Sequence, residues 1–258
     1  MNWYPQLSSG TSHQFPIRRV RKWRTIANKF DDGEQVAYAD SHAGVVEWRL
    51  RYAELQESEV AALRALFVAS KGRAGSFGFL DPLVNLLAGS EDLSRPEWRA
   101  GLMTVAGGVT DPAGGTTAWR VSNASAGLQD LAQTLSFPAS TMSSFSVYLR
   151  SPMAEAVTVL RDNKSLSVAV GPQWQRHFIS VPGDTDSVTS SFSVRLAAGQ
   201  GIEVWGFQVE AQLFPSQYQR SISGVGIYEE TSFAMDELNT VATSPGLWSC
   251  EISLVSRA

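Results

Sequence analysis

Hydrophobic and polar residues alternate strictly at the end of the chain, in LWSCEISLVSRA (residues 247–258). The apolar side chains fall on one side of an extended segment, and the serines and glutamate fall on the other, which predicts a half-buried strand. A strand needs a neighbour for its backbone hydrogen-bonding groups. The segment VEWRLRY (residues 46–52) alternates in the same way, and we expect the final strand to pair with it.

A helical period follows that earlier segment. In ESEVAALRALFVASKG (residues 57–72), apolar residues recur at helical spacing and the first turn is acidic. Lys71 in the last turn and Gly72 as the C-cap agree with a single amphipathic helix of about 14 residues. GSFGFLDP (residues 75–82) then predicts a short apolar strand.

Between about residues 83 and 223 the charge thins out, and Ser, Thr, Gly, Ala and Val take over in short alternating segments. Many short strands without any helical period predict an antiparallel β-sandwich, and about eight strands fit a jelly roll. The segments that predict strands are TTAWRVSN, LAQTLSF, SSFSVYLRS, AVTVLRD, SLSVAVG, QRHFISVP, SFSVRLA and IEVWGFQVEAQ.

The segments on both sides of this sandwich share a mixed, more charged composition, which favours an insertion. We expect a mainly β fold with one helix, in which residues 1–88 and 224–258 form one domain and residues 89–223 are inserted into it. The alternative is two or three consecutive domains followed by a free C-terminal hairpin.

Composition narrows the function classes. The chain has 258 residues, of which 43% are hydrophobic and 18% charged, as expected for a folded protein. Its net charge of −4 argues against a sequence-independent grip on nucleic acid or on an anionic membrane. The start lacks signal-peptide features and no apolar run approaches a membrane span, so we expect synthesis in a cytoplasm and no membrane insertion. The single cysteine, Cys250, excludes a disulfide framework and predicts a buried thiol.

The segments of the N-terminal part resemble, in their order, the tail-hub proteins of long-tailed bacteriophages: the distal tail protein and related minor tail proteins. The segment WSCEISLVSR matches the closing strand of that family. The resemblance implies a barrel-like domain that assembles into a ring, a hexamer, at the distal tail tip or baseplate of the virion. Its partners would be the tail tube and the hub or tip proteins, and DNA would pass only transiently through the lumen. The segments that carry the resemblance are RRVRKWRTIANKF, DDGEQ, VVEWRLRYAEL, SEVAALRALFVASKG and GSFGFLDP.

A second resemblance lies in VWGFQVEAQLFPSQYQRS (residues 204–221), which is similar to the closing segment of carbohydrate-binding jelly rolls on phage tail proteins. SSFSVYLRS and QWQRHFISVP stand where that group has two further strands. The sequence departs from the pattern at Ser144-Phe145, where a Trp or Phe is usual, and at Arg150, where a Lys is usual. The resemblance implies a sandwich that touches host surface polysaccharide or braces the baseplate.

Sugar binding needs exposed aromatic rings and polar groups for the hydroxyls. The candidates are Trp174, Tyr148, Trp119 and Arg176, and Trp174 is the preferred platform because it lies just past a turn. Trp205, in the closing segment, is expected to pack in the core.

The basic stretch from Arg18 to Arg24 alternates along an expected strand. We interpret it as a contact with an acidic neighbouring subunit; a patch for the DNA that passes through the tail is the alternative. The candidate contact residues are Arg18, Arg19, Arg21, Lys22 and Arg24.

No catalytic pattern stands out, and we expect neither an enzyme nor a cofactor. The histidines are scattered, and Ser76 follows a helix, whereas a nucleophile elbow needs a strand before it. A glycosidase needs two carboxylates in one cleft, and Glu203 and Glu210 would fall on opposite faces of a regular strand. Asp184 and Asp186 are candidate calcium ligands, with a solvated hairpin turn as the alternative.

Two other functions remain open at this point. One is a free-standing carbohydrate-binding or glycan-hydrolysing accessory protein. The other is the same tail component in a gene transfer agent or tailocin.

Overall fold

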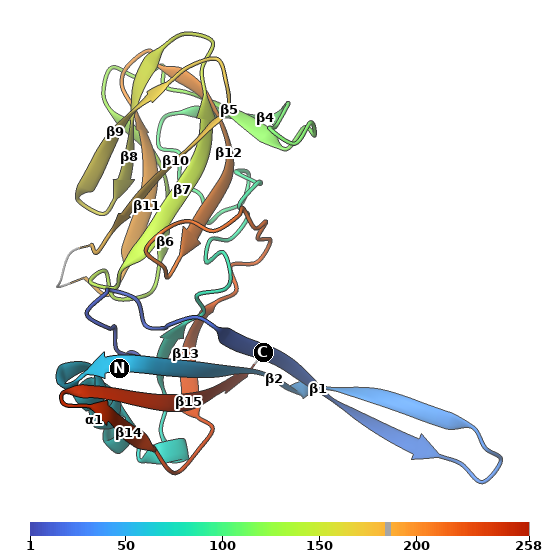
Figure 1. The fold of residues 1–258 in the computed structure, drawn as a ribbon. Helices are drawn as coiled ribbons and strands as arrows, with labels where there is room; N and C mark the ends of the chain where they lie inside the picture. Colours follow the sequence, from blue (N-terminus) through green and yellow to red (C-terminus); the bar gives the residue numbers. More distant parts are fainter. Residues whose placement is uncertain (184–186, 258) are drawn as a thin grey trace. The chain divides into compact units, whose positions relative to one another are not determined.

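The computed structural model describes residues 1–183 and 187–257, and the chain divides into two compact units (Figure 1). Met1–Leu80 and the chain from Tyr228 onward form the terminal unit, and Asp81–Ile227 form the sandwich unit. These boundaries lie outside the expected 89–223, because the flanking residues pair with each other within the sandwich unit. The Asp81 N–H donates to the Gly226 carbonyl at 2.8 Å, so this unit begins and ends at adjacent points.

The terminal unit contains a six-stranded sheet and one helix. The sheet has the order β1-β2-β15-β13-β3, and β14, which is not part of this order, also pairs with β15. This order starts at β1 and ends at β3, so in the described residues the sheet is open, whereas a barrel-like unit was expected. The elements are β1 (Ile17–Lys29), β2 (Gln35–Gln56), α1 (Glu57–Ala69), a 3₁₀ turn (Gly72–Ala74), β3 (Phe77–Leu80), β13 (Ile227–Phe233), β14 (Thr240–Ser244) and β15 (Leu247–Arg257).

The final strand pairs with the segment that alternates like it. β15 runs antiparallel to β2, with Ile252 opposite Leu50 and Leu254 opposite Trp48. All four of these side chains are fully buried. The predicted pairing of the two ends of the chain is therefore confirmed.

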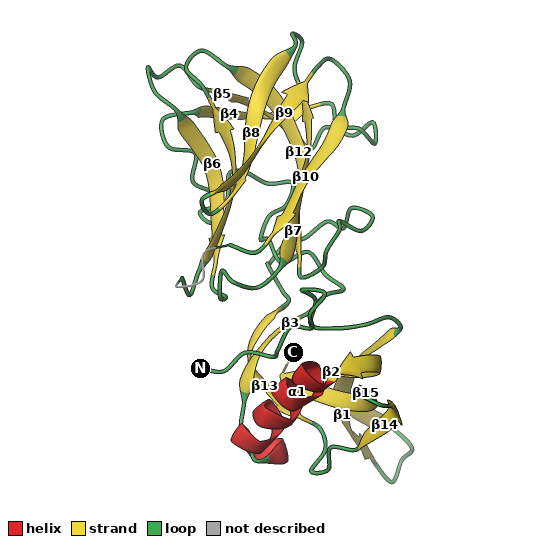
Figure 2. Ribbon diagram, turned by 60° about the vertical axis from the view of Figure 1, so that its left-hand side comes forward, coloured by secondary structure: helices red, strands yellow, loops and turns green. Residues whose placement is uncertain are grey.

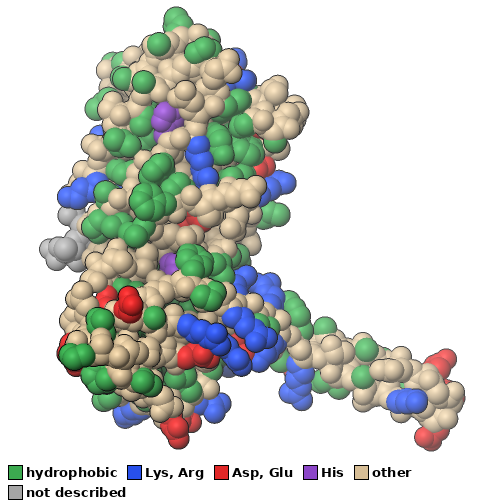
Figure 3. Space-filling model, viewed as in Figure 1, with side chains coloured by type: hydrophobic (Ala, Val, Ile, Leu, Met, Phe, Trp, Pro, Cys, Tyr) green, Lys and Arg blue, Asp and Glu red, His purple; other side chains and the backbone are tan. Residues whose placement is uncertain are grey.

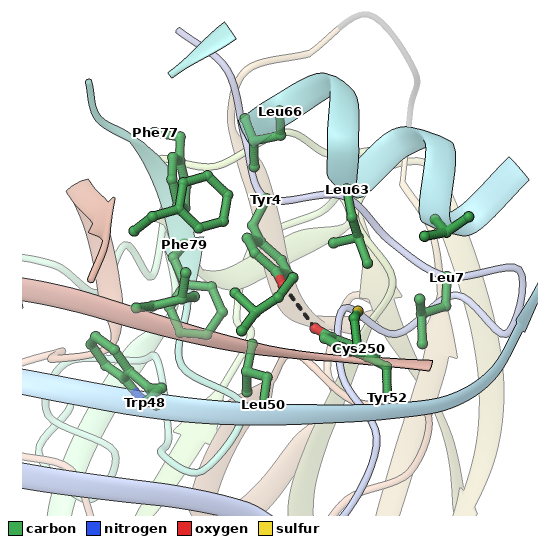
Figure 4. Close-up of a cluster of buried hydrophobic side chains, with 14 of the residues drawn as sticks. Tyr4, Leu7, Trp48, Leu50, Tyr52, Leu63, Leu66, Phe77, Phe79 and Cys250 are labelled. Carbon is green, nitrogen blue, oxygen red and sulfur yellow. Dashed lines mark hydrogen bonds between the residues drawn. The ribbon is translucent and has the colours of Figure 1, made fainter. Parts of the chain in front are cut away.

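The core of the terminal unit lies between this sheet and α1 (Figure 4). Val60, Leu63 and Leu66 point from the helix into the cluster, opposite the inward side chains of β2 and β15. The Tyr4 and Tyr52 hydroxyls share a hydrogen bond of 2.9 Å inside it. Cys250 is buried there as a free thiol, as predicted, and burial raises its pKa to about 11.

The helix ends differently from the prediction. It stops at Ala69, and Ser70 is its C-cap. Lys71, rather than Gly72, is the first residue in the left-handed region, with a φ of 52°. The Ser70 carbonyl accepts the N–H of Gly75 at 2.8 Å, which closes the turn that leads into β3.

The sandwich unit consists of two facing antiparallel sheets (Figure 2). One has the order β10-β7-β12-β5-β4, and the other β6-β11-β8-β9. Phe145, Phe192 and Phe207 are among the fully buried side chains that fill the space between them. The strands are β4 (Thr104–Val109), β5 (Ala118–Ser122), β6 (Gln129–Leu135), β7 (Ser143–Arg150), β8 (Glu155–Arg161), β9 (Lys164–Val170), β10 (Gln175–Val181), β11 (Ser190–Leu196) and β12 (Gly201–Glu210).

All eight strands predicted for this region are present, and the predicted sandwich is confirmed. The alternation pattern did not predict β4, whose register against β5 shifts between Ala106 and Val109. Gly107 and Gly108 stand at this irregularity, and they hide the alternation that a strand would otherwise show.

The hairpin of β1 and β2 continues beyond the rest of the sheet as a two-stranded arm, residues 23–44 (Figure 1). β15 pairs with β2 only as far as Val45, so within the arm the two strands have only each other among the described residues. The turn at its end contains Gly33, whose φ of +89° favours glycine.

Candidate functional site

The outer face of the five-stranded sheet, turned away from the second sheet, carries the polar and aromatic residues of the sandwich unit. Cross-strand pairing places Glu203 opposite Arg150 and Trp205 opposite Tyr148 on this face. Arg120 on β5 lies opposite Glu203 on its other side. One end of the face is open, and the other is covered by the chain that follows β12.

The open end forms a cleft of about 510 Å³. Glu203 lies at its centre between two arginines: Arg120 Nη2 donates to Glu203 Oε1 at 2.8 Å, and Arg150 Nε donates to Oε2. Among the described residues that line the cleft, Glu203 is the only carboxylate. The lining residues are Arg120, Ser122, Arg150, Ser151, Pro152, Pro172, Gly201, Ile202 and Glu203.

The two arginines determine the charge of this cleft. Burial alone would raise the pKa of Glu203, but the hydrogen bonds from Arg120 and Arg150 outweigh burial and hold that pKa below its usual value. Glu203 is therefore ionised at neutral pH and is poorly suited to act as a general acid. The Arg120 side chain is 65% exposed, so most of its N–H donors face solvent.

Trp174, the preferred sugar platform, lies beside this cleft but is half-buried. The guanidinium carbon of Arg150 lies 4.7 Å from the Trp174 ring centroid, so a cation covers one face of the ring. The Trp174 Nε1 is buried without a hydrogen-bond partner in the described part of the chain. The expected bare aromatic platform is thus an arginine–tryptophan pair.

Tyr148, Trp205 and Arg176 form the next row across the sheet. The ring centroids of Tyr148 and Trp205 are 5.2 Å apart, and the guanidinium carbon of Arg176 lies 5.6 Å from the Tyr148 ring centroid. Trp205 is half-buried on the outer face, with its Nε1 donating to Thr117 Oγ1 at 2.8 Å. The expectation that Trp205 packs in the core was wrong, because its neighbours Val204 and Ile202 take the inward positions.

Trp119 does not join this row. It pairs with Val204, an inward residue of β12. Its Nε1 donates to the Glu91 carbonyl at 2.8 Å, and the ring passes so close to Gly107 that a Cβ there would approach it to 3.2 Å. Trp119 therefore packs against the chain and offers no free platform on the outer face.

The covered end of the face is built around Glu210, which is fully buried. Its carboxylate accepts hydrogen bonds from Gln208 Nε2, Gln212 Nε2 and the backbone and hydroxyl of Ser216, at 2.5 to 3.0 Å. A structural role was expected for Glu210, and these bonds agree with it. They fasten residues 211–221 across the sheet.

Glu203 and Glu210 lie on the same face, contrary to expectation. The register of β12 shifts between Trp205 and Gln208, at Gly206 with a φ of 64°. This bulge adds one residue to β12, so the side chains after it point to the faces opposite to those that strict alternation predicts.

Sequence reasoning missed the most exposed aromatic pair of the sandwich unit. Phe214 is 69% exposed, and its ring lies 6.4 Å from that of Phe178. Phe178 follows the outward Arg176 in β10, so an alternation count from Arg176 could have found it.

The basic candidates of the terminal unit lie on β1. Their expected alternation fails at Trp23, where the register against β2 shifts between Lys22 and Arg24. Lys22 pairs with Glu47, and Arg24 lies 3.8 Å from Asp40. Arg18 is exposed and faces Arg49 across the strands. Arg21 is also exposed, whereas Arg19 is half-buried.

The remaining predictions concern metals and membranes. Asp184 and Asp186 lie outside the described residues. Within residues 1–183 and 187–257, no group of three or more His, Cys, Asp or Glu is arranged to hold a metal ion. No helix in this part of the chain combines the length and apolar character needed to cross a membrane.

No family model and no curated protein matches the chain. Solved structures similar to it include carbohydrate-binding modules. TmCBM61, solved with β-1,4-galactotriose, has a TM-score of 0.37 and 14% identity over 49% of this chain and 97% of that chain. The C-terminal family 22 carbohydrate-binding module of Clostridium thermocellum Xyn10B has a TM-score of 0.40 and 14% identity over 51% and 96%.

A phage protein is also similar. The enzymatically active domain of tailspike protein 4 of bacteriophage CBA120 has a TM-score of 0.38 and 12% identity over 50% of this chain and 22% of that chain. All three TM-scores lie below 0.5, so the likeness carries no conclusion about ligand or activity.

Proposed function

We propose that this protein is a structural component of a long-tailed phage virion, without enzymatic activity. Its terminal unit forms a ring, a hexamer, at the distal end of the tail tube, where it contacts the tube and the hub or tip proteins. DNA passes through the lumen only during ejection. The sandwich unit faces host surface glycans.

One observation carries this proposal. The two ends of the chain close a single sheet, and an arm with exposed large apolar side chains continues from it. An isolated two-stranded hairpin is at best marginally stable in water, and edge strands with exposed apolar residues favour association. A cyclic assembly covers such surfaces on every copy.

Light scattering on the purified full-length chain tests the ring. We expect a species of six times the 28.0 kDa chain mass, visible as a ring by negative-stain electron microscopy. A compact monomer at every concentration, together with sugar affinity, would favour the free-standing accessory protein instead. Labelling of particles, with sequencing of the DNA they contain, would then distinguish a phage from a tailocin, which has no head, and from a gene transfer agent, whose head carries host DNA.

The cleft around Glu203 favours glycan contact as a second function of the same protein. Its volume lies in the range of small-ligand sites, and Arg120 and Arg150 present N–H donors to its interior. Arg150 in turn packs over the face of the Trp174 ring, which holds its guanidinium in place. Hydroxyl oxygens of a saccharide match these donors.

A glycan array probed with the full-length chain, followed by calorimetry on the best ligand, tests this contact. Arg120→Ala and Arg150→Ala should each weaken binding by about tenfold, the usual cost of losing a hydrogen bond to a charged group. The matched control is Lys164→Ala on β9, which lies in the other sheet. Silence across bacterial glycans would remove the glycan function and leave the sandwich a bracing role.

A further inference from the structure

The arm exposes apolar side chains on strands that pair only with each other. Trp23 is 64% and Tyr38 57% exposed, and Ile26, exposed as well, stands opposite Tyr38. Every residue of β1 from Arg21 to Lys29 is exposed. Such a hairpin gains stability only by lying against another surface.

The end of the arm is acidic. Asp31, Asp32 and Glu34 are exposed in the turn, and none of them forms an ion pair with a described residue. The Asp32 carboxylate accepts the N–H of Glu34 at 3.0 Å, which holds the turn in shape. We call these three residues the acidic tip.

The sheet from which the arm continues carries the opposite charge on its outer face. Arg18 lies directly opposite Arg49, and no ion pair to either is found among the described residues. Arg51 joins them around a small cleft of about 160 Å³ and pairs with Glu251 at 2.9 Å. We call Arg18, Arg49 and Arg51 the arginine patch. Figure 3 shows basic side chains, with some acidic ones among them, where the arm leaves the sheet, and acidic side chains beside a basic one at its far end.

Two arginines directly opposite each other repel and destabilise a sheet. The nearby carboxylates Glu47 and Glu251 pair with Lys22 and Arg51 instead. This exposed arginine pair therefore has no ion-pair partner among the described residues. An anionic partner would relieve the repulsion, and the cleft between the guanidinium groups has room for carboxylates.

The acidic tip cannot reach the arginine patch of its own copy. A strand rises about 3.3 Å per residue, so Arg18 near the start of β1 and Asp31, two residues past its end, lie roughly 40 Å apart. That separation is comparable to the width of a domain of this size. The arm is thus long enough to cross a neighbouring copy.

We propose that the acidic tip of one copy docks on the arginine patch of the next copy, with the apolar residues of the arm lying against that neighbour. The two surfaces differ, so the contact is head-to-tail and repeats from copy to copy until the ring closes. The inference rests on the proposed ring and specifies which residues hold it together.

Charge reversal in the full-length chain tests this contact. Asp31→Lys with Asp32→Lys and Glu34→Lys reverses the tip, and Arg18→Glu with Arg49→Glu reverses the patch. Each variant alone should need about tenfold or more higher concentration to assemble, because like charges then meet across the interface. An equimolar mixture of the two variants should assemble again, since each tip then meets an opposite patch.

Two controls keep a folding defect apart from a lost contact. Arg18→Glu alone places a carboxylate opposite Arg49, so its thermal stability should be equal or higher while its assembly still weakens. Lys164→Glu on β9 should change neither property. Raising the ionic strength should weaken wild-type assembly.

The outcomes separate this inference from the proposed function. If every charge-reversed variant forms rings as readily as the wild type, the tip-to-patch contact is overturned, but the proposed ring itself is not. A wild-type chain that stays monomeric at all concentrations would overturn both. Loss of duplex DNA binding on Arg18→Glu with Arg49→Glu, with assembly unchanged, would assign the patch to nucleic acid and likewise overturn the contact.

Discussion

The two units use their apolar residues differently. In the sandwich unit, two sheets face each other and bury a row of phenylalanines between them, and even its outer face is half covered by residues 211–221. In the terminal unit, the sheet buries one face against α1, while the arm leaves Trp23, Ile26 and Tyr38 in solvent. The terminal unit thus carries a strand pair whose apolar side chains no other described strand covers, and we propose that a neighbouring copy covers them.

The largest effect is expected from breaking the strand that joins the chain ends. Ile252→Asp places a charge in the fully buried contact with Leu50 and should destabilise the terminal unit by about 4 kcal/mol or more. Val241→Asp, at an exposed position of β14, is the control. Calorimetry on Ile252→Asp should show that the thermal transition of the terminal unit is lost and that the transition of the sandwich unit is retained. Loss of both transitions together would mean that the units are not independent.

A second substitution probes the sandwich alone. Glu210→Ala removes the acceptor of several buried hydrogen bonds and releases residues 211–221. We expect a loss of about 3 kcal/mol, since buried donors are left unpaired. Urea unfolding, read from the sandwich transition, measures it. A change below about 1 kcal/mol would contradict the fastening role of Glu210.

Substitutions in the arm should affect assembly rather than stability. Ile26→Ser with Tyr38→Ser changes exposed residues, and the free energy of unfolding should shift by less than about 0.5 kcal/mol. Assembly should nevertheless weaken clearly in sedimentation velocity runs. A stability loss with unchanged assembly would show that these side chains serve the monomer.

The smallest effect concerns pH and the cleft. The folded-state pKa of Glu203 lies below its ordinary value of 4.5, so its ion pairs stabilise the fold above that pH. Their contribution, under about 1 kcal/mol because Arg120 is exposed, is lost as the pH falls through the folded-state pKa. Between pH 7 and pH 3, the unfolding midpoint should therefore fall further in wild type than in Glu203→Gln. Equal falls would exclude the ion pairs as a source of stability.

Alternation predicted most of the strands, the pairing of β15 with β2 and the burial of Cys250. It failed where one residue interrupts the pattern. The bulge at Gly206 brought Glu203 and Glu210 to one face, and the register of β1 against β2 shifts between Lys22 and Arg24. The Arg120–Glu203–Arg150 group could not be predicted from the sequence for another reason. Its members sit on three strands, and only the register of the sheet brings them together.

The sequence pattern did not predict the exposure of the arm either. RRVRKWRTIANKF predicts a strand in either case, and nothing in its pattern states where its sheet partners end. Among the described residues, β15 pairs with β2 as far as Val45, and its own residues lie about 200 positions away in sequence.

We propose that the arm serves assembly. Replacing residues 23–44 by Asn-Gly joins Lys22 to Val45, which already form a cross-strand pair, through a two-residue hairpin turn. Light scattering across a concentration series should show the full-length chain as a closed oligomer and the shortened chain as a monomer with both thermal transitions intact. Equal assembly of the two chains would contradict the claim.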